Sequence, residues 1–408
     1  MTSYLFKNVR VADGSAAEPS EPIQVFVDGY KIAEVGENIP ASADETIDLT
    51  GKFLMPGLID CHAHTIAAES SFARNAELPD SLVAARASLV LRNMLMRGFT
   101  TVRDLGGADY GLKCAIEEGI FASPRLVICG KALSQTGGHG DFRGRFNSKP
   151  EVRWGLPLGA LGRICDGVPE VRRAAREEIK GGADFIKIMA NGGAASPTDP
   201  IHYLGFSREE MLAVVEEARN AGTYVAAHLY TDEAIHRAIH AGVHSLEHCN
   251  LIRRETADYA AAEGCIAVPT LVAFEALASE GASVGFSPDS LAKVEVIRSK
   301  GMESLTIMRD AGLPMAYGSD LLGALQRHQS EEFVIRGSVL PPHEVIASAT
   351  SVAAKLLRME GKIGTISPGA FADLIVVDGN PLNDLSLLTR QGQHMTLIMR
   401  GGVIVKHV

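Results

Sequence analysis

The chain has 408 residues, of which 46% are hydrophobic and 22% charged, and its formal net charge is −10 at pH 7. This length is enough for one barrel-sized domain and a smaller one. The acidic balance, without any basic run, argues against nucleic acid or an anionic membrane surface as a partner.

The cysteines and the first residues of the chain indicate the cellular compartment in which we expect the protein. The six cysteines lie far apart and include no Cys-x-x-Cys pair, which favours a reducing compartment over a disulfide framework. The opening stretch MTSYLFKNVRVADG has no apolar signal core, and no apolar run reaches about 18 residues. We therefore expect a soluble, cytoplasmic protein without a membrane partner.

Both ends of the chain read as β-strands. YLFKNVRVADG, IQVFVDGYKIAEVG and ETIDLTGKFLMPG near the start, and ADLIVVDGN and MTLIMRGGVIVKHV near the end, show alternation interrupted by turn residues. Neither end has enough strands for a stable sheet of its own. We predict that residues 1–57 and 363–408 combine into one small β-sandwich domain.

The middle of the chain alternates between short apolar strands and amphipathic helices. Eight successive strand–helix units predict the α/β class and a (β/α)8 TIM-like barrel over residues 58–362. The expected strands span residues 58–64, 100–106, 125–134, 185–193, 224–230, 245–249, 266–273 and 315–320.

Polar residues that can bind a metal stand at the carboxyl ends of five of these strands. In such a barrel the carboxyl ends of the strands meet at one mouth, where catalytic groups gather. His62 and His64 are two residues apart in LIDCHAHT, so they face the same side of a strand. Histidine is the commonest metal ligand near neutral pH. The full set is His62, His64, Lys187, His228, His248 and Asp320.

Lys187 is the member of this set that indicates most about the chemistry of the site. Its neighbours Ile186 and Ile188 indicate a buried strand, where a charged ammonium is expensive. One interpretation is a lysine paired with a carboxylate. The other is that burial lowers the pKa of the amine, which then takes up carbon dioxide and becomes a carbamate able to bridge two metal ions.

The set resembles the amidohydrolase superfamily, in which His-x-His, Lys, His, His and Asp occupy strands one, four, five, six and eight. The resemblance implies a hydrolase with two divalent ions, zinc being the expected metal. It assigns His62, His64 and Asp320 to the more buried ion, His228 and His248 to the more exposed one, and carboxylated Lys187 to the bridge. It also makes Asp320 a general base that later acts as an acid.

Longer strings resemble one branch of that superfamily. ALSQTGGHGD, IKIMANGGAASPTDP, AAHLYTDEAI, PTLVAFEALASEG and VVDGNPLNDL are similar to metal-dependent Xaa-Pro dipeptidases and carboxypeptidases, a branch related to imidazolonepropionase-like proteins. The single-metal deaminases instead lack the strand-four lysine and carry a Glu shortly after the strand-five histidine, where this chain has Tyr230 and Asp232.

The branch also implies substrate-binding residues. By resemblance, His139 and Tyr230 face the carbonyl and the α-carboxylate of the substrate. Arg143 and Arg145 are further candidates, because guanidinium groups bind carboxylates in a bidentate manner. The alternatives are a histidine that caps a turn, a core tyrosine and solvated loop arginines.

Together these patterns predict a metal-dependent hydrolase that cleaves the amide bond before a C-terminal residue with a free carboxylate. Xaa-Pro dipeptides are the expected substrates, and a homo-oligomer is the expected assembly. One alternative is a broader carboxypeptidase or N-acyl-amino-acid hydrolase, including enzymes that cleave ochratoxin-type amides. A second alternative is a protein that binds the metal only for structure, although structural zinc is usually enclosed by four protein ligands.

Overall fold

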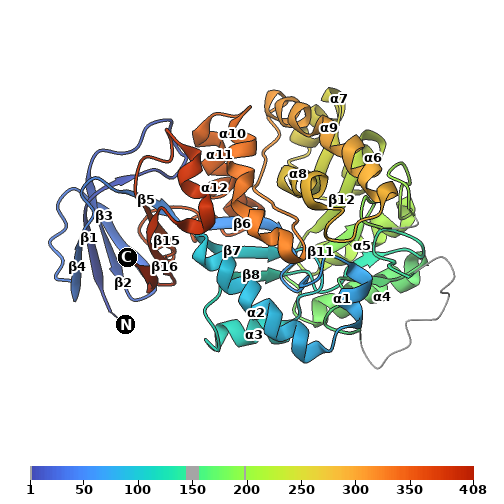
Figure 1. Cartoon of the computed structure of the whole chain (residues 1–408), viewed down its shortest axis with the longest axis horizontal. Coiled ribbons are helices and arrows are strands. Elements are labelled where there is room, and N and C mark those ends of the chain that lie inside the picture. Colours follow the sequence, from blue (N-terminus) through green and yellow to red (C-terminus); the bar gives the residue numbers. More distant parts are fainter. Residues whose placement is uncertain (1, 144–155, 197–198) are drawn as a thin grey trace.

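The two ends of the chain form one sheet at one side of the molecule (Figure 1). The computed structural model describes residues 2–143, 156–196 and 199–408. The sheet runs in the order β17-β16-β15-β5-β1-β2-β3, and β4 also pairs with β1. Its strands are β1 (Tyr4–Val11), β2 (Ile23–Asp28), β3 (Lys31–Gly36), β4 (Glu45–Asp48), β5 (Phe53–Pro56), β15 (Leu374–Val377), β16 (Met395–Arg400) and β17 (Val403–His407).

Strand β15 fixes this sheet to the rest of the molecule. It pairs antiparallel with β5, and all of its side chains are buried. Leu374 and Val376 pack among the terminal strands, whereas Ile375 and Val377 join the larger core of the strand–helix region. Both ends of the chain therefore meet in one sheet. The β-sandwich arrangement and the domain boundaries stay predictions.

Parallel strands make up the middle of the chain. Three form a sheet in the order β6-β7-β8, and six form a sheet in the order β10-β9-β11-β12-β13-β14. The first sheet contains β6 (Leu58–Ala63), β7 (Phe99–Asp104) and β8 (Arg125–Ile128). The second contains β9 (Ala132–Ser134), β10 (Gly162–Ile164), β11 (Ile186–Met189), β12 (Val225–Thr231), β13 (Ser245–Leu251) and β14 (Ile266–Val268).

Hydrogen bonds connect the two parallel sheets at two places where the edge of one sheet meets the edge of the other, which we call seams. At one seam the Asp184 amide donates to the Ile128 carbonyl at 2.7 Å. At the other, residues 314–320 lie between β14 and β6. There the Ala316 amide donates to Ala267 and the Cys61 amide to Tyr317, each at 2.8 Å. The parallel sheets agree with a TIM-like fold, whereas closure of an eight-stranded barrel stays a prediction.

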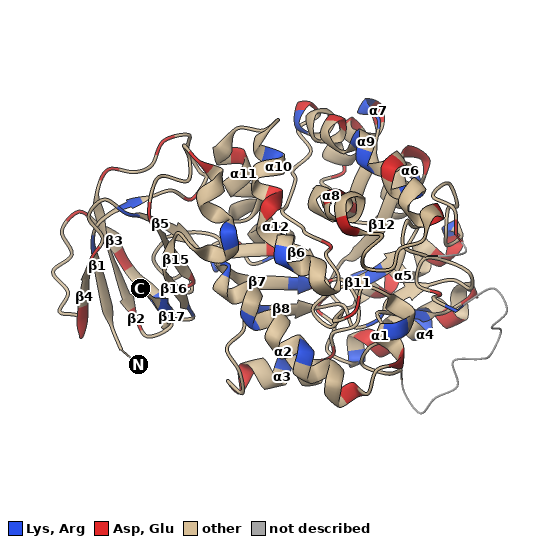
Figure 2. Cartoon of the chain, in the orientation of Figure 1, with Lys and Arg blue, Asp and Glu red and all other residues tan. Residues whose placement is uncertain are grey.

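Helices cover the parallel strands, and acidic and basic side chains are interspersed along them (Figure 2). None of the helices in the described part of the chain has the length and apolar character needed to cross a lipid bilayer. The α-helices are α1 (Phe72–Glu77), α2 (Asp80–Met96), α3 (Tyr110–Glu117), α4 (Gly167–Lys180), α5 (Arg208–Asn220), α6 (Asp232–Ala241), α7 (Arg254–Ala262), α8 (Leu271–Glu280), α9 (Pro288–Asp310), α10 (Glu332–Gly337), α11 (Pro342–Ser348) and α12 (Ser351–Leu356). The 3-10 segments are η1 (Gly323–Glu331), η2 (Leu385–Leu388) and η3 (Arg390–Gly392).

Local sequence explains why these helices begin and end where they do. Helix α5 starts with a capping box, in which the Ser207 side chain accepts from the Glu210 amide and the Glu210 side chain accepts from the Ser207 amide. Helix α6 starts at the Thr231 cap and ends at Gly242, whose φ of 92° closes the last turn. Helices α4, α5 and α6 lie between parallel strands, where amphipathic helices are expected from the sequence.

Three of the expected strands differ from the structure. Residues 266–273 form a strand only over β14, and helix α8 begins at Leu271. Residues 125–134 form two short strands rather than one, because Gly130 between them has a φ of 67°. Residues 315–320 form no strand; Met315 makes a single bridge to Ala267, and Asp320 has a φ of 52°. Near its carboxyl end, the last segment therefore turns instead of continuing as a strand.

Candidate active site

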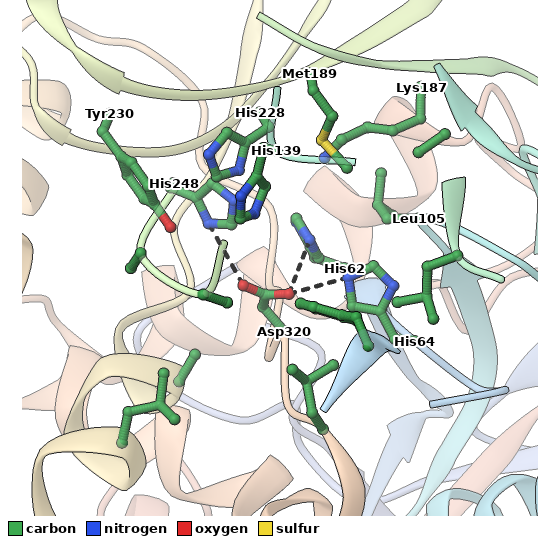
Figure 3. Close-up of a pocket in the computed structure, with 18 of the residues that line it drawn as sticks. His62, His64, Leu105, His139, Lys187, Met189, His228, Tyr230, His248 and Asp320 are labelled. Atoms are coloured by element: carbon green, nitrogen blue, oxygen red, sulfur yellow. Dashed lines mark ion pairs between the residues drawn. The ribbon is translucent and has the colours of Figure 1, made fainter. Parts of the chain in front are cut away.

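One cavity gathers the predicted metal-binding residues from segments that are far apart in the sequence (Figure 3). His139 and Tyr230 line the same cavity. The predicted ligands found there are His62, His64, Lys187, His228, His248 and Asp320. All are buried except Asp320, whose side chain is 20% exposed.

Strand alternation aims the first two histidines at this cavity. His62 and His64 line it, whereas Cys61 and Ala63 pack into the core behind them. A strand whose side chains alternate between two faces produces this division. The expectation that the two imidazoles share one face is confirmed.

The same alternation brings Lys187 into the cavity. Ile186 and Ile188 on either side of it belong to the core, as predicted. Lys187 is 1% exposed, and burial lowers the pKa of its amine, although Glu247 and Asp320 oppose the shift. An amine with a lowered pKa has a larger neutral fraction, and the neutral form is the nucleophile that carbon dioxide needs.

Strand β13 departs from regular alternation. His248 and Cys249 have φ values of 70° and 58°, in the left-handed region. As a result, Glu247 and His248 both reach His62, although they are consecutive residues. Glu247 hydrogen-bonds the His62 ring, and the His248 ring centroid lies 4.8 Å from that of His62.

Asp320 sits between three imidazoles (Figure 3). Its Oδ1 lies 3.3 Å from His62 Nε2 and 3.1 Å from His64 Nε2, and its Oδ2 lies 3.9 Å from His248 Nδ1. Burial alone would raise the pKa of this carboxyl, but His62 and the other imidazoles outweigh burial and hold it well below its usual value. Asp320 is therefore an anion at neutral pH.

These groups suit a divalent cation. His62, His248 and Asp320 offer ligand atoms that all lie within 4.8 Å of one another. Burial lowers the pKa values of His228 and His248 well below the usual histidine value, so both rings are neutral and keep a lone pair. Neutral imidazoles with a carboxylate are the donors that zinc and similar ions take.

A buried carboxylate that sequence reasoning missed supports His62. Glu247 Oε2 lies 2.8 Å from His62 Nδ1, and Glu247 Oε1 accepts from Arg103 at 2.9 Å. Both Glu247 and Arg103 are fully buried. A carboxylate on Nδ1 leaves Nε2 as the metal-facing nitrogen. The available signal was a glutamate inside the apolar strand SLEHC, next to the predicted ligand His248.

His139 is held by the loop that follows β11. Its Nδ1 lies 2.8 Å from the Ser196 hydroxyl oxygen and 3.8 Å from Asp199 Oδ2. Its ring stacks on His228 with centroids 4.3 Å apart, and a Cβ at Gly193 would overlap it. The loop therefore leaves room for His139 only because residue 193 is glycine.

Tyr230 lies against the same imidazoles. Its ring centroid is 4.5 Å from that of His228 and 5.1 Å from that of His248, two rings that lie beside it in Figure 3. The ring centroid of Phe274 is 5.9 Å away. Burial raises the pKa of its hydroxyl well above the usual tyrosine value, and Asp320 and Asp199 act in the same direction. The group is therefore a hydrogen-bond donor at neutral pH.

The two candidate arginines differ in position. Arg143 pairs with Asp141 through two nitrogens, each 2.7 Å from a carboxylate oxygen, and it does not line the cavity of His139 and Tyr230. Arg145 lies outside the described residues.

The sequence profile of the Amidohydrolase family matches residues 53–405. The chain belongs to this family. It is therefore a hydrolase of amide bonds, and the alternative of a purely structural metal-binding protein is set aside.

Three relatives of this amidohydrolase represent the predicted branch. A prolidase, in a crystal structure with N-methylphosphonate-L-proline, is 45% identical, covers 100% of both chains and has a TM-score of 0.98. The ochratoxinase of Aspergillus niger is 32% identical over 370 residues, which is 86% of this chain and 75% of that protein. An imidazolonepropionase of Cereibacter sphaeroides is 27% identical over 419 residues, covering 93% of this chain and 94% of that protein.

Proposed function

We propose that this amidohydrolase cleaves the amide bond before a C-terminal residue that carries a free carboxylate, with Xaa-Pro dipeptides as its main substrates. The observation that carries the proposal is the packing of His139 and Tyr230 directly onto His228, beside Asp320. The full-length similarity to a prolidase bound to a proline phosphonate supports proline as the leaving residue.

The proposed metal centre holds two divalent ions, with zinc as the expected metal. His62, His64 and Asp320 would hold one ion, and His228 and His248 the other. Lys187, carboxylated by carbon dioxide, would bridge them. The lowered pKa of the Lys187 amine supports this chemistry. When bound, the ions supply hydroxide at neutral pH and polarise the scissile carbonyl.

Asp320 is the proposed proton carrier. Its carboxylate is ionised at neutral pH, and its side chain is partly exposed to the cavity. Asp320 takes the proton of the attacking water and delivers it to the leaving nitrogen, first as a base and then as an acid.

His139 and Tyr230 are the proposed carboxylate-binding and carbonyl-binding residues. The raised pKa of Tyr230 keeps its O–H as a donor, and Ser196 at His139 Nδ1 leaves the opposite ring nitrogen for the substrate. Arg143 and Arg145 are the proposed additional carboxylate contacts. For Arg143 this role requires the guanidinium to share Asp141 with the substrate, or to leave Asp141.

The test compares Leu-Pro with Leu-Pro-amide in wild type and Tyr230→Phe. Losing a charge-assisted hydrogen bond costs roughly 1.5–3 kcal/mol, or about ten- to hundredfold in kcat/KM. We expect the amide to be poorer by that factor, and Tyr230→Phe to lose a similar factor on the acid and little more on the amide. Equal rates on acid and amide would eliminate carboxylate recognition.

The second candidate is a broader carboxypeptidase or N-acyl-amino-acid hydrolase, which the similarity to an ochratoxinase favours. Leu-Phe and N-acetyl-Phe, added to the same assay, separate the two. A clear preference for the Phe compounds would keep the mechanism and move the function to this candidate. A homo-oligomer and a cytoplasmic location are also part of the proposal.

A further inference from the structure

The 3-10 segment η1 presents two buried glutamines to the interior of the molecule. Side chains three residues apart lie on one face of a 3-10 helix. Gln326 and Gln329 have this spacing, and they are only 6% and 1% exposed. Arg327 and His328, which lie between them in the sequence, pair instead with Glu280 of α8. One face of η1 therefore carries two carboxamides that water does not reach.

Gln329 contacts the segments of two predicted ligands through Asp60. Its Nε2 donates to Asp60 Oδ2 at 2.8 Å. Asp60 is fully buried, and its Oδ1 accepts the amides of His62 at 3.0 Å and Ser319 at 3.2 Å. The Ser319 hydroxyl donates to Asp60 Oδ2 at 2.6 Å. Because Ser319 directly precedes Asp320, Asp60 joins the segments of two predicted ligands.

Gln326 contacts the segment of a third predicted ligand. Its Nε2 donates to the His64 carbonyl at 3.2 Å and to the Ala67 carbonyl at 3.0 Å. The Gly323 amide at the start of η1 also donates to the Ala67 carbonyl, at 2.9 Å. The chain that leaves β6 is therefore hydrogen-bonded to η1 at His64 itself.

Arg97 determines how the Gln329 carboxamide is oriented. Its Nε donates to Gln329 Oε1 at 2.9 Å, and its Nη1 donates to Gln391 Oε1 at 3.1 Å. A guanidinium can only donate, so the oxygen of the Gln329 carboxamide must face Arg97. The nitrogen then faces Asp60, which it holds. Arg97 is 4% exposed, and it connects this network to η3 in the C-terminal part of the chain.

We propose that the two glutamines of η1 are positioning residues of the metal centre, and that Arg97 orients one of them. They hold the segments of His62, His64 and Asp320 at the spacing that one metal ion requires. The inference rests on the metal centre of the proposed function. Neither glutamine lines the cavity that contains the ligands, so both act through the backbone of the ligand segments and not on the substrate.

Zinc affinity, measured by competition with a chelator, tests the proposal without any substrate. Gln326→Met and Gln329→Met keep the length of the side chain and remove its hydrogen bonds. Loss of contacts that orient metal ligands typically lowers metal affinity about 10–100-fold, so we expect a loss of at least about tenfold in each variant. Arg327→Met changes an exposed side chain of the same segment and should keep the wild-type affinity.

The comparison with the control decides the outcome. If both glutamine variants bind zinc as tightly as Arg327→Met, η1 does not position the ligands and the proposal is wrong. Gln326 has only backbone carbonyls as partners, so its replacement leaves no charged group unpaired. Gln326→Met therefore decides the question if Gln329→Met does not fold.

The visible absorption of bound cobalt separates positioning from a general loss of stability. This absorption depends on the geometry of the ligands around the ion, which a lower free energy of unfolding does not change by itself. At full cobalt occupancy, we expect an altered spectrum in both glutamine variants and an unaltered one in Arg327→Met. Wild-type spectra in all three variants would contradict the proposal.

A double-mutant cycle tests the role of Arg97. Arg97→Met should lower zinc affinity, because Gln329 loses the contact that orients it. If Arg97 acts through Gln329, the protein with both Arg97→Met and Gln329→Met should bind zinc nearly as well as Gln329→Met alone. Two losses that multiply in the double variant would reject the route through Gln329.

Failure of this inference and failure of the proposed function give different results. A wild-type protein that binds zinc but does not cleave Xaa-Pro dipeptides would reject the proposed substrate, whereas weaker zinc binding in the glutamine variants would still support the positioning role. A wild-type protein that binds zinc and cleaves Leu-Pro, with unchanged zinc affinity in both glutamine variants, would reject the inference alone.

Discussion

At the scale of single residues, two candidate ligands, His248 and Asp320, and the neighbouring Cys249 have unusual backbone conformations. His248, Cys249 and Asp320 have φ values of 70°, 58° and 52°. Non-glycine residues in the left-handed region cost of order 1–3 kcal/mol each. The surrounding hydrogen bonds hold these conformations. Ser319 and Asp320 both donate their amides to the His62 carbonyl, at 3.1 and 2.7 Å.

The first prediction concerns Asp320. Asp320→Asn keeps the shape but removes the proton acceptor, and general acid–base groups contribute about 10²–10⁴-fold. We expect kcat to fall by at least that factor, with the fold retained by circular dichroism. Asp310→Asn, at an exposed position at the end of α9, is the matched control. A near-normal rate in Asp320→Asn would place the proton carrier elsewhere.

The second prediction concerns Lys187. Lys187→Arg should lose both metal and activity, because a guanidinium stays protonated and cannot form a carbamate. Lys187→Ala should also lose both, and a short carboxylic acid should restore part of the activity by replacing the carbamate. Metal content by elemental analysis is the readout besides activity. An active Lys187→Arg enzyme would refute the carbamate bridge.

The third prediction concerns Glu247. Glu247→Gln leaves the buried Arg103 cation without its partner, which costs roughly 3–5 kcal/mol in the free energy of unfolding. It also weakens the support of His62, and loss of such contacts typically lowers metal affinity about 10–100-fold. Competition with a chelator measures that affinity. Glu263→Gln, an exposed change, is the control, and equal affinities in the two variants would remove Glu247 from the metal-supporting network.

At the scale of elements, helix α9 is hydrogen-bonded to the loop that follows β11. Lys293 of α9 donates its amine to the carbonyls of Gly193, Ser196 and Asp199, at distances of 3.0, 2.9 and 3.2 Å. Ser196 in turn contacts His139. Lys293 is therefore a positioning residue for His139, although it lies about 100 residues away from the loop in the sequence.

The fourth prediction tests this attachment. Lys293→Met removes three charge-assisted hydrogen bonds but keeps the aliphatic stem. We expect KM to rise about tenfold or more as the loop loosens, with partial recovery in Lys293→Arg. Lys300 lies on the same helix and pairs only with Glu303 among the described side chains, so Lys300→Met is the matched control. If both lysine variants behave alike, α9 does not position His139.

At the scale of the whole molecule, a metal ion bound at the candidate ligands would couple the site to the stability of the chain. The candidate ligands come from β6 and the residue after it, from β11, β12 and β13, and from the segment after Met315. An ion that binds them in the folded state only would stabilise that state, by about 4 kcal/mol at a thousandfold excess over Kd. Such an ion would therefore stabilise strands of both parallel sheets.

The fifth prediction concerns metal removal. Active protein should carry close to two divalent ions per chain. A chelator should lower Tm and abolish activity, and zinc, cobalt or manganese should restore both. Elemental analysis that returns one tightly bound ion per active chain would reject the two-ion centre.

The sequence alone determined that His62, His64 and Lys187 face the cavity. Alternation along LIDCHAHT and FIKIMANGG placed His62, His64 and Lys187 on inward faces, because the side-chain period of a strand is local. The carboxyl ends of parallel strands share one mouth, so strand order was enough to predict that these groups meet. The strands at both ends of the chain are local signals of the same kind.

Only the tertiary structure decided how these groups are held. Glu247 contacts His62 across 185 residues, and Lys293 reaches its loop from α9. The left-handed turns at His248 and Asp320 break the period on which sequence reasoning relies. Contacts of this kind depend on how whole elements pack against one another, and no local pattern encodes that packing.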